Sequence, residues 1–239
     1  MFRSKPNRTS TILMLSVALV VIVIAVMMTG CAATIYDKSS VSYVDAAFSP
    51  THLRTHGLAL LPVVAGQGQE GYRRPLGDCL AASTEELMGG GHFLGWRETM
   101  AALNEQDLSD EYEDLIGTYR ETAILRQEAV NELGLALGVR YLLFVSLERF
   151  HTSTSTTYNA FTGLNSERTS AVNAFCQVWD TATGNVVWEG AAAARSAGNE
   201  FTYDKPYEEY ARKAADGLTA RLFGVKTEKQ DYDHLRRDF

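Results

Sequence analysis

An uncharged apolar run of 18 residues near the N-terminus separates this 239-residue chain into a targeting part and a folding part. The run covers residues 11–28 and follows a basic head that contains Arg3, Lys5 and Arg8. A segment of this length and polarity is typical of a signal sequence or a membrane anchor. A folded domain is therefore expected only in the residues that follow it.

The apolar run ends in a tetrapeptide that resembles the bacterial lipobox. Met28, Thr29 and Gly30 precede Cys31, where the run gives way to small residues. In lipoproteins with this motif the cysteine thiol receives a diacylglycerol, the signal peptide is cut before the cysteine, and the new amino terminus is usually acylated with a fatty acid such as palmitate. The resemblance implies that residues 1–30 are a lipoprotein signal peptide and that Cys31 is lipidated. Two or three acyl chains hold a domain at a membrane, since each buried methylene contributes about 0.8 kcal/mol.

Two features of this segment bear on the final location of the protein. Met28 stands where the lipobox usually has Leu, Val or Ile, and 18 apolar residues are about enough to span a bilayer. An uncleaved transmembrane helix is therefore the alternative. Ala32 follows the cysteine, where inner-membrane lipoproteins of enteric bacteria typically have Asp. The resemblance thus implies a lipoprotein of the outer membrane that faces the periplasm.

The charge balance argues against nucleic acid as a partner. Residues 1–30 hold three basic and no acidic residues, so the other 209 residues carry 19 Lys or Arg against 29 Asp or Glu, a formal charge of -10. Adjacent basic residues occur only as pairs, at residues 73–74, 212–213 and 236–237. Such a surface neither neutralises a phosphate backbone nor adsorbs on anionic lipid by charge.

The rest of the chain divides into a linker, one domain and a tail. Residues 31–56 are polar and lack a period, which predicts a lipidated N-terminus and a linker. Residues 57–224 have the apolar patterns of a folded periplasmic domain, and residues 225–239 form a charged C-terminal tail. The length is suited to a single domain.

Apolar periodicity within residues 57–224 predicts an α/β (α+β) fold, a mixed sheet of about five strands with helices packed on it. The predicted strands are residues 58–64, 93–96, 141–147, 169–179 and 186–195, the last two joined by a turn at residues 180–185. The predicted helices are residues 75–88, 98–105, 121–137 and 207–223. Residues 109–114 are an acidic stretch without an assigned element.

Two cysteines remain after Cys31. Cys79 lies in a predicted helix and Cys176 in a predicted strand, so they form a disulfide only if that helix packs across the sheet at that point. The oxidising periplasm permits such a bond. The alternative is two buried thiols, since free cysteine is among the most buried residue types.

The sequence contains no motif that predicts catalysis, a metal or a cofactor. None of GxSxG, SxxK and HExxH is present, and His52 and His56, four residues apart, have no third ligand nearby. Gly66, Gly68 and Gly71 match GxGxxG, but three residues separate the last glycine from the predicted helix, and a loop is expected instead. We therefore predict that the protein is not an enzyme.

A long polar segment joins two of the predicted strands. Its Thr and Ser residues at 152–157 are followed by Tyr158 and Phe161. One interpretation is an extended hairpin tip. The other is that Tyr158 and Phe161 are exposed aromatic side chains that anchor a partner, with specificity in loops such as residues 152–168.

The order of these elements resembles a known group of envelope proteins. The features are Leu61-Pro62-Val63 in the first strand, Ala136-Leu137-Gly138-Val139 before Tyr141-Leu142-Leu143, and the turn from Val178-Trp179-Asp180 to Thr183-Gly184 and Val186-Val187-Trp188. They resemble the curli-secretion lipoproteins, the penicillin-binding-protein activator lipoproteins and the TolB N-terminal-like fold. The resemblance implies a lipid-anchored, non-enzymatic binding or accessory module in cell-envelope assembly, whose partners are the membrane and envelope proteins. The alternatives are a subunit of an oligomeric curli-type secretion assembly and, less favoured, an envelope hydrolase.

Two departures from that group qualify the resemblance. Curli-secretion proteins use hairpins that alternate apolar and polar residues, and residues 152–157 with their flanks do not alternate. The activator lipoproteins often have a long Pro-rich tether, whereas about 25 residues follow Cys31 here and would reach about 80 Å when extended. Contact with an inner-membrane enzyme is therefore not favoured by length.

Overall fold

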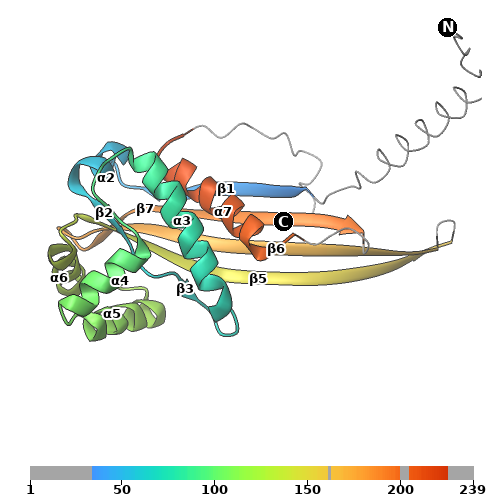
Figure 1. Ribbon diagram of the computed structural model, residues 1–239, viewed down its shortest axis with the longest axis horizontal. Helices are drawn as coiled ribbons and strands as arrows, with labels where there is room; N and C mark the ends of the chain where they lie inside the picture. Colours follow the sequence, from blue (N-terminus) through green and yellow to red (C-terminus); the bar gives the residue numbers. More distant parts are fainter. Residues whose placement is uncertain (1–33, 161–162, 200–204, 226–239) are drawn as a thin grey trace, which may run out of the picture.

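A long mixed sheet organises the structure, a computed structural model that describes residues 34–160, 163–199 and 205–225 (Figure 1). Within these residues seven strands form one sheet in the order β1-β7-β6-β5-β2-β4, and β3 also pairs with β5. The strands are β1 (Ile35–Val44), β2 (Leu58–Leu60), β3 (Val64–Ala65), β4 (Phe93–Leu94), β5 (Tyr141–Asn159), β6 (Gly163–Asp180) and β7 (Asn185–Asn199). β1, β7, β6 and β5, the first four strands in this order, pair antiparallel with their neighbours. β2 and β3 run parallel to β5, and β2 also runs parallel to β4. The expected mixed α+β fold is confirmed, with seven strands in place of about five.

Helices cover both faces of the sheet at one end. The described residues form α2 (Pro50–His56), the short 3₁₀ helix η1 (Glu70–Tyr72), α3 (Arg73–Met88), α4 (Trp96–Glu105), α5 (Ser109–Thr122), α6 (Gln127–Leu137) and α7 (Tyr207–Leu222). On one face, Leu80 of α3 and Leu218 of α7 belong to the core that contains Val145. On the other face, Leu115 of α5 and Leu133 of α6 belong to the core that contains Trp179.

The antiparallel hairpin in the centre of the sheet was predicted correctly from alternation. The turn at residues 180–185 joins β6 to β7, and Gly184 there has a φ of 70°, which glycine adopts without strain. The helix expected at residues 207–223 is α7, which buries Tyr210 and Ala214 against the sheet. The strand expected at residues 58–64 is divided into β2 and β3, and Pro62, which has no N–H for a ladder, lies between them.

The segment expected to be a linker is part of the fold. Residues 35–44 form β1, which pairs with β7 from Ile35 opposite Ser196 to Val44 opposite Trp188. Because β1 is an edge strand with many exposed side chains, it lacks the apolar alternation that would have revealed it. Ser49 then caps α2, which has Pro50 in its first turn and ends at Gly57.

The prediction of a single helix at residues 121–137 is also wrong, because two helices share this part of the chain. The acidic stretch begins α5, which ends when Ala123 enters the left-handed region at φ 55°. The N–H of Ala123 donates to the carbonyl of Tyr119 at 2.7 Å, and the N–H of Ile124 donates to Oγ1 of Thr122 at 3.1 Å. These bonds end the helix, and a new helix, α6, begins at Gln127. The apolar spacing continued across the break and concealed it.

Residues 152–157 belong to an extended hairpin, as the first of the two interpretations had it, and they are not a loop. β5 extends for 19 residues and pairs with β6 up to Asn159 opposite Gly163. Hydroxyl groups face each other across the pair, with 2.9 Å between Oγ1 of Thr152 and Oγ of Ser170. Thr and Ser side chains whose hydroxyl groups bond across the strands can therefore extend the β5–β6 ladder where it has no apolar face.

Two helical glycines test the packing of α6 on the β6–β7 turn. A Cβ at Gly134 would overlap the side chain of Thr181, whereas a Cβ at Gly117 in α5 would meet nothing within 4 Å. We expect Gly134→Ala to lower the free energy of unfolding by about 1–3 kcal/mol because it overpacks a buried contact. Gly117→Ala should raise that free energy by about 0.5–1 kcal/mol because alanine favours a helix. Urea unfolding measures the free energy of unfolding of both variants. Equal changes would contradict the close contact between Gly134 and Thr181.

Candidate functional site

The sheet has two chemically different ends. At the end where β5 starts and β6 finishes, a polar cluster adjoins a cavity. At the opposite end, β5 and β6 continue as a hairpin beyond the helices (Figure 1). The exposed aromatic residue singled out from the sequence lies at this second end.

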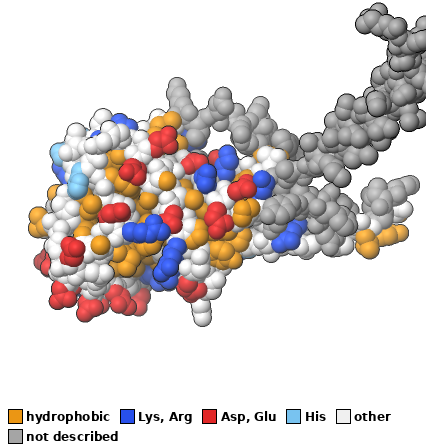
Figure 2. All heavy atoms as spheres, viewed as in Figure 1, with side chains coloured by type: hydrophobic (Ala, Val, Ile, Leu, Met, Phe, Trp, Pro, Cys, Tyr) orange, Lys and Arg blue, Asp and Glu red, His pale blue; other side chains and the backbone are white. Residues whose placement is uncertain are grey.

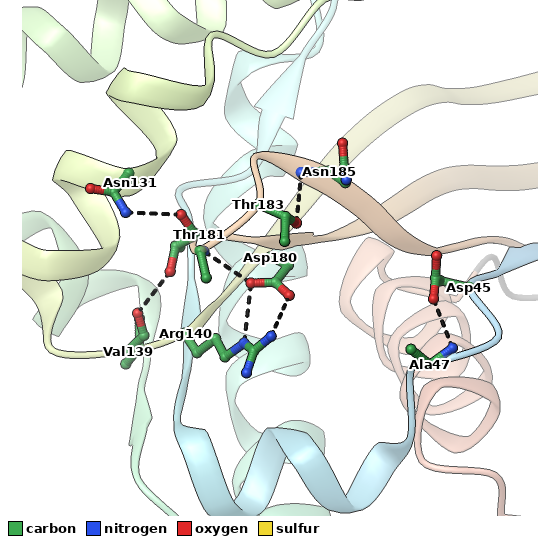
Figure 3. Close-up of polar contacts among 10 residues, drawn as sticks. Asp45, Ala47, Asn131, Val139, Arg140, Asp180, Thr181, Thr183 and Asn185 are labelled. Carbon is green, nitrogen blue, oxygen red and sulfur yellow. Dashed lines mark hydrogen bonds and ion pairs between the residues drawn. The ribbon is translucent and has the colours of Figure 1, made fainter.

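An ion pair forms the centre of the polar cluster (Figure 3). Nε of Arg140 donates to Oδ1 of Asp180 at 3.2 Å, and Nη2 donates to Oδ2 at 2.9 Å. The Asp180 side chain is 7% exposed and that of Arg140 is 42% exposed. The hydrogen bonds to Asp180 raise the pKa of Arg140, so this guanidinium stays charged.

The β6–β7 turn holds Asp180 in place. The N–H of Ala182 donates to Oδ1 of Asp180 at 2.9 Å. The hydroxyl of Thr181 donates to the carbonyl of Val139 at 3.3 Å, and Nδ2 of Asn131 donates to the carbonyl of Thr181 at 3.2 Å. Because Asp180 accepts three hydrogen bonds, it acts as a structural anion that ties the turn to the start of β5.

The cavity beside this ion pair has a volume of about 280 Å³. Its lining includes Asp45, Phe48, His52, His56, Arg140, Tyr141 and Asp180. The rings of His52 and His56 are 6.0 Å apart between centroids, so α2 brings these two side chains together. Within the part of the chain that the structure describes, no group of three or more His, Cys, Asp or Glu could hold a metal ion.

The opposite end presents an apolar pair at the tip of the hairpin. Tyr158 pairs across the strands with Leu164, and each side chain is 75% exposed. Figure 2 shows hydrophobic side chains at this tip. Phe161 lies outside the described residues. Leu164 was missed in the sequence because its role depends on the register that places it beside Tyr158.

The two remaining cysteines are free thiols in the structure and do not pair. Cys79 on α3 is partly buried, and its Sγ lies 4.0 Å from the carbonyl of Glu208 on α7. Cys176 on β6 is buried in the core beneath α3 and α7. Burial raises the pKa of both thiols, so the reactive thiolate is disfavoured in the folded protein.

The glycine-rich segment does not have the geometry of a dinucleotide site. Gly66 and Gly68 precede η1, whose last residue adjoins α3. The side chain of Gln69 accepts a hydrogen bond from the N–H of Phe150 at 3.0 Å. The segment therefore packs against β5.

The residues of the lipobox, Met28, Thr29, Gly30 and Cys31, lie outside the described residues. In residues 34–160, 163–199 and 205–225, no helix has the length and apolar character needed to cross a bilayer.

The ion pair at the β6–β7 turn makes a stability prediction. Arg140→Ala should lower the free energy of unfolding by about 2 kcal/mol because it leaves a buried carboxylate without its counterion. Arg97→Ala is the control, since the Arg97–Asp78 pair is exposed (63% and 43%) and such pairs contribute about 0–1 kcal/mol. If urea unfolding showed the same loss of unfolding free energy for both variants, Arg140 would not be needed to stabilise the buried carboxylate of Asp180.

Thiol labelling tests the state of the cysteines. We expect iodoacetamide to leave Cys176 unmodified at neutral pH and to modify Cys79 slowly, because burial disfavours both thiolates. When the protein is unfolded in guanidinium without reductant, iodoacetamide should modify both residues. Mass spectrometry detects the modification. Residues that react only after reduction would indicate a disulfide.

Comparison with known proteins gives similarities to solved structures only. No family model matches the chain, and no curated protein matches it. The PelC dodecamer from Paraburkholderia phytofirmans aligns with a TM-score of 0.44 and 10% identity, covering 81% of this chain and 100% of that chain. The lipoprotein GNA1162 from Neisseria meningitidis aligns with a TM-score of 0.32 and 14% identity, covering 70% and 92%. The LpoB C-terminal domain from Salmonella enterica aligns with a TM-score of 0.33 and 13% identity, covering 62% and 86%.

Proposed function

We propose that this protein is a lipid-anchored, non-enzymatic binding module that faces the periplasm and serves as an accessory factor in cell-envelope assembly. The observation that carries the proposal is the position of Cys31, which lies four residues before Ile35, the first residue of β1. A lipid on Cys31 would therefore attach almost directly to the sheet.

The short connection determines how such a module would work. Four residues span at most about 14 Å, in contrast to the about 80 Å expected for a linker of residues 32–56. β1 is held in place by its ladder with β7 and by a hydrogen bond of 3.2 Å from Nε of Arg221 to Oγ of Ser39. The domain would thus remain at the membrane surface, and partners would bind it there.

The ion pair in the cavity supports a binding role, because its carboxylate is not available as a general base. A general base needs a lone pair that can accept a proton from a substrate. Asp180 is committed to Arg140 and to the N–H of Ala182. The cavity is therefore built around a structural ion pair, which favours a scaffold that presents surfaces to other proteins.

The direction of β1 indicates which surface would face the periplasm. β1 begins beside Ser196, and its last residue, Val44, pairs with Trp188, close to the β6–β7 turn. The cavity and α6 therefore lie at the end of the sheet away from the start of β1. Figure 2 shows acidic side chains gathered at that end, where Asp110, Asp114 and Glu132 line a hollow between α5 and α6.

Processing of the precursor tests the anchor. We expect mass spectrometry of the membrane-extracted protein to find acylated Cys31 at the new N-terminus, and Cys31→Ala to accumulate as an uncut precursor. Cys79→Ala is the matched control and should be processed normally. If Cys31→Ala were cut and released like the native chain, the lipoprotein proposal would be wrong.

The partner is tested on the same extract. We expect light scattering in mild detergent to find a monomer or a complex of fixed stoichiometry with another envelope protein, which the same peak would identify. A large homo-oligomer would instead favour the secretion-assembly alternative.

A further inference from the structure

We infer that the tip of the β5–β6 hairpin inserts Tyr158 and Leu164 into the headgroup region of the membrane that holds the lipid on Cys31. This inference rests on the proposed lipidation of Cys31. It adds a second membrane contact that would orient the domain with its cavity toward the periplasm.

The hairpin projects beyond the rest of the sheet (Figure 1). β7 ends at Asn199, opposite Glu167 of β6, whereas β5 and β6 pair as far as Asn159 opposite Gly163. Every described side chain of residues 151–158 is exposed, so the helices do not cover this part of β5. A two-stranded hairpin with both faces in water is only marginally stable. A contact at its tip would therefore help to keep it formed.

The tip and the start of β1 lie at the same end of the sheet. Ile35 pairs with Ser196, Ser196 with Ser170, and Ser170 with Thr152, so these residues are level across four strands. Tyr158 lies six residues beyond Thr152, which corresponds to about 20 Å at about 3.4 Å per residue. Cys31 can lie at most about 14 Å from Ile35. The tip therefore reaches at least as far in this direction as the lipidated residue can.

The composition of the tip suits a lipid interface. Tyr158 and Leu164 are 75% exposed and share one face of the hairpin. A tyrosine ring favours the boundary between acyl chains and headgroups, where its hydroxyl remains hydrated. No charged residue occurs between Thr152 and Ser166, so insertion would not take a charge out of water.

The backbone limits the depth of insertion. From Glu167 toward the tip, β5 and β6 pair with no other described strand, so no described strand ladder uses the outer edges of the hairpin. Backbone N–H and C=O groups at such edges need water or headgroups as partners and cannot enter the hydrocarbon core unpaired. The tip would therefore stop in the headgroup region.

Tryptophan reporters test the inference on the full lipidated protein in vesicles of phosphatidylethanolamine and phosphatidylglycerol. Tyr158→Trp and Leu164→Trp report on the tip from each strand. Leu135→Trp is the matched control, because Leu135 is 76% exposed on α6, at the opposite end of the sheet. Brominated acyl chains quench nearby indole rings, and subtraction of the native protein removes the signal of Trp96, Trp179 and Trp188. Mass spectrometry of the same vesicles reports the lipid on Cys31.

We expect blue-shifted emission and severalfold stronger quenching for the two tip variants than for Leu135→Trp. Water-like, unquenched emission with acylated Cys31 would overturn the inference and leave the proposed function intact. Blue-shifted emission that brominated lipid does not quench would show that a protein, either a second copy or a partner, covers the tip, and would also overturn the inference. Absence of lipid on Cys31 would overturn the proposed function and, with it, this inference.

Discussion

The long antiparallel ladder between β5 and β6, whose register shifts once between Leu147 and Arg149, is the constraint on which the rest of the structure depends. It runs from Tyr141 opposite Asp180 to Asn159 opposite Gly163. At its first end both faces are buried, with Val145 in the core under α3 and α7, and Phe144 stacked on Trp179 at 4.9 Å between ring centroids in the other core. At its far end neither face is covered. β5 and β6 thus form both the middle of the domain and the hairpin that projects from it.

This ladder also separates two kinds of chemistry. Near its start, charge-assisted hydrogen bonds between Arg140 and Asp180 tie β5 to the β6–β7 turn, and Asn131 of α6 donates a further hydrogen bond to that turn. Near its finish, uncharged Thr and Ser side chains lead to Tyr158 and Leu164. Because strands rise by about 3.4 Å per residue, the 19 residues of β5 place these two kinds of chemistry at opposite ends of the sheet. In the proposed function, one end of this ladder would contact lipid and the other end would be left for a periplasmic partner.

The sequence predicted those elements whose signals are local. The alternation in residues 169–179, the turn at residues 180–185 and the apolar stripe of α7 each arise within one element, and the structure contains all three. The prediction was wrong where burial comes from distant residues. β1 is an edge strand that joins the sheet through β7, so its own residues show little alternation. The break at Ala123 depends on hydrogen bonds that the apolar spacing does not reveal.

The same distinction applies to the candidate sites. The sequence by itself determined the fold class, because that follows from short-range patterns of polarity. It gave the exposure of Tyr158 as one of two interpretations, and the structure shows this side chain 75% exposed. Only the tertiary structure decided that Leu164 lies beside Tyr158, that Cys79 and Cys176 remain apart, and that the start of β1 is level with Thr152. These facts depend on strand register and on helix placement, which are set by the packing of segments far apart in the chain.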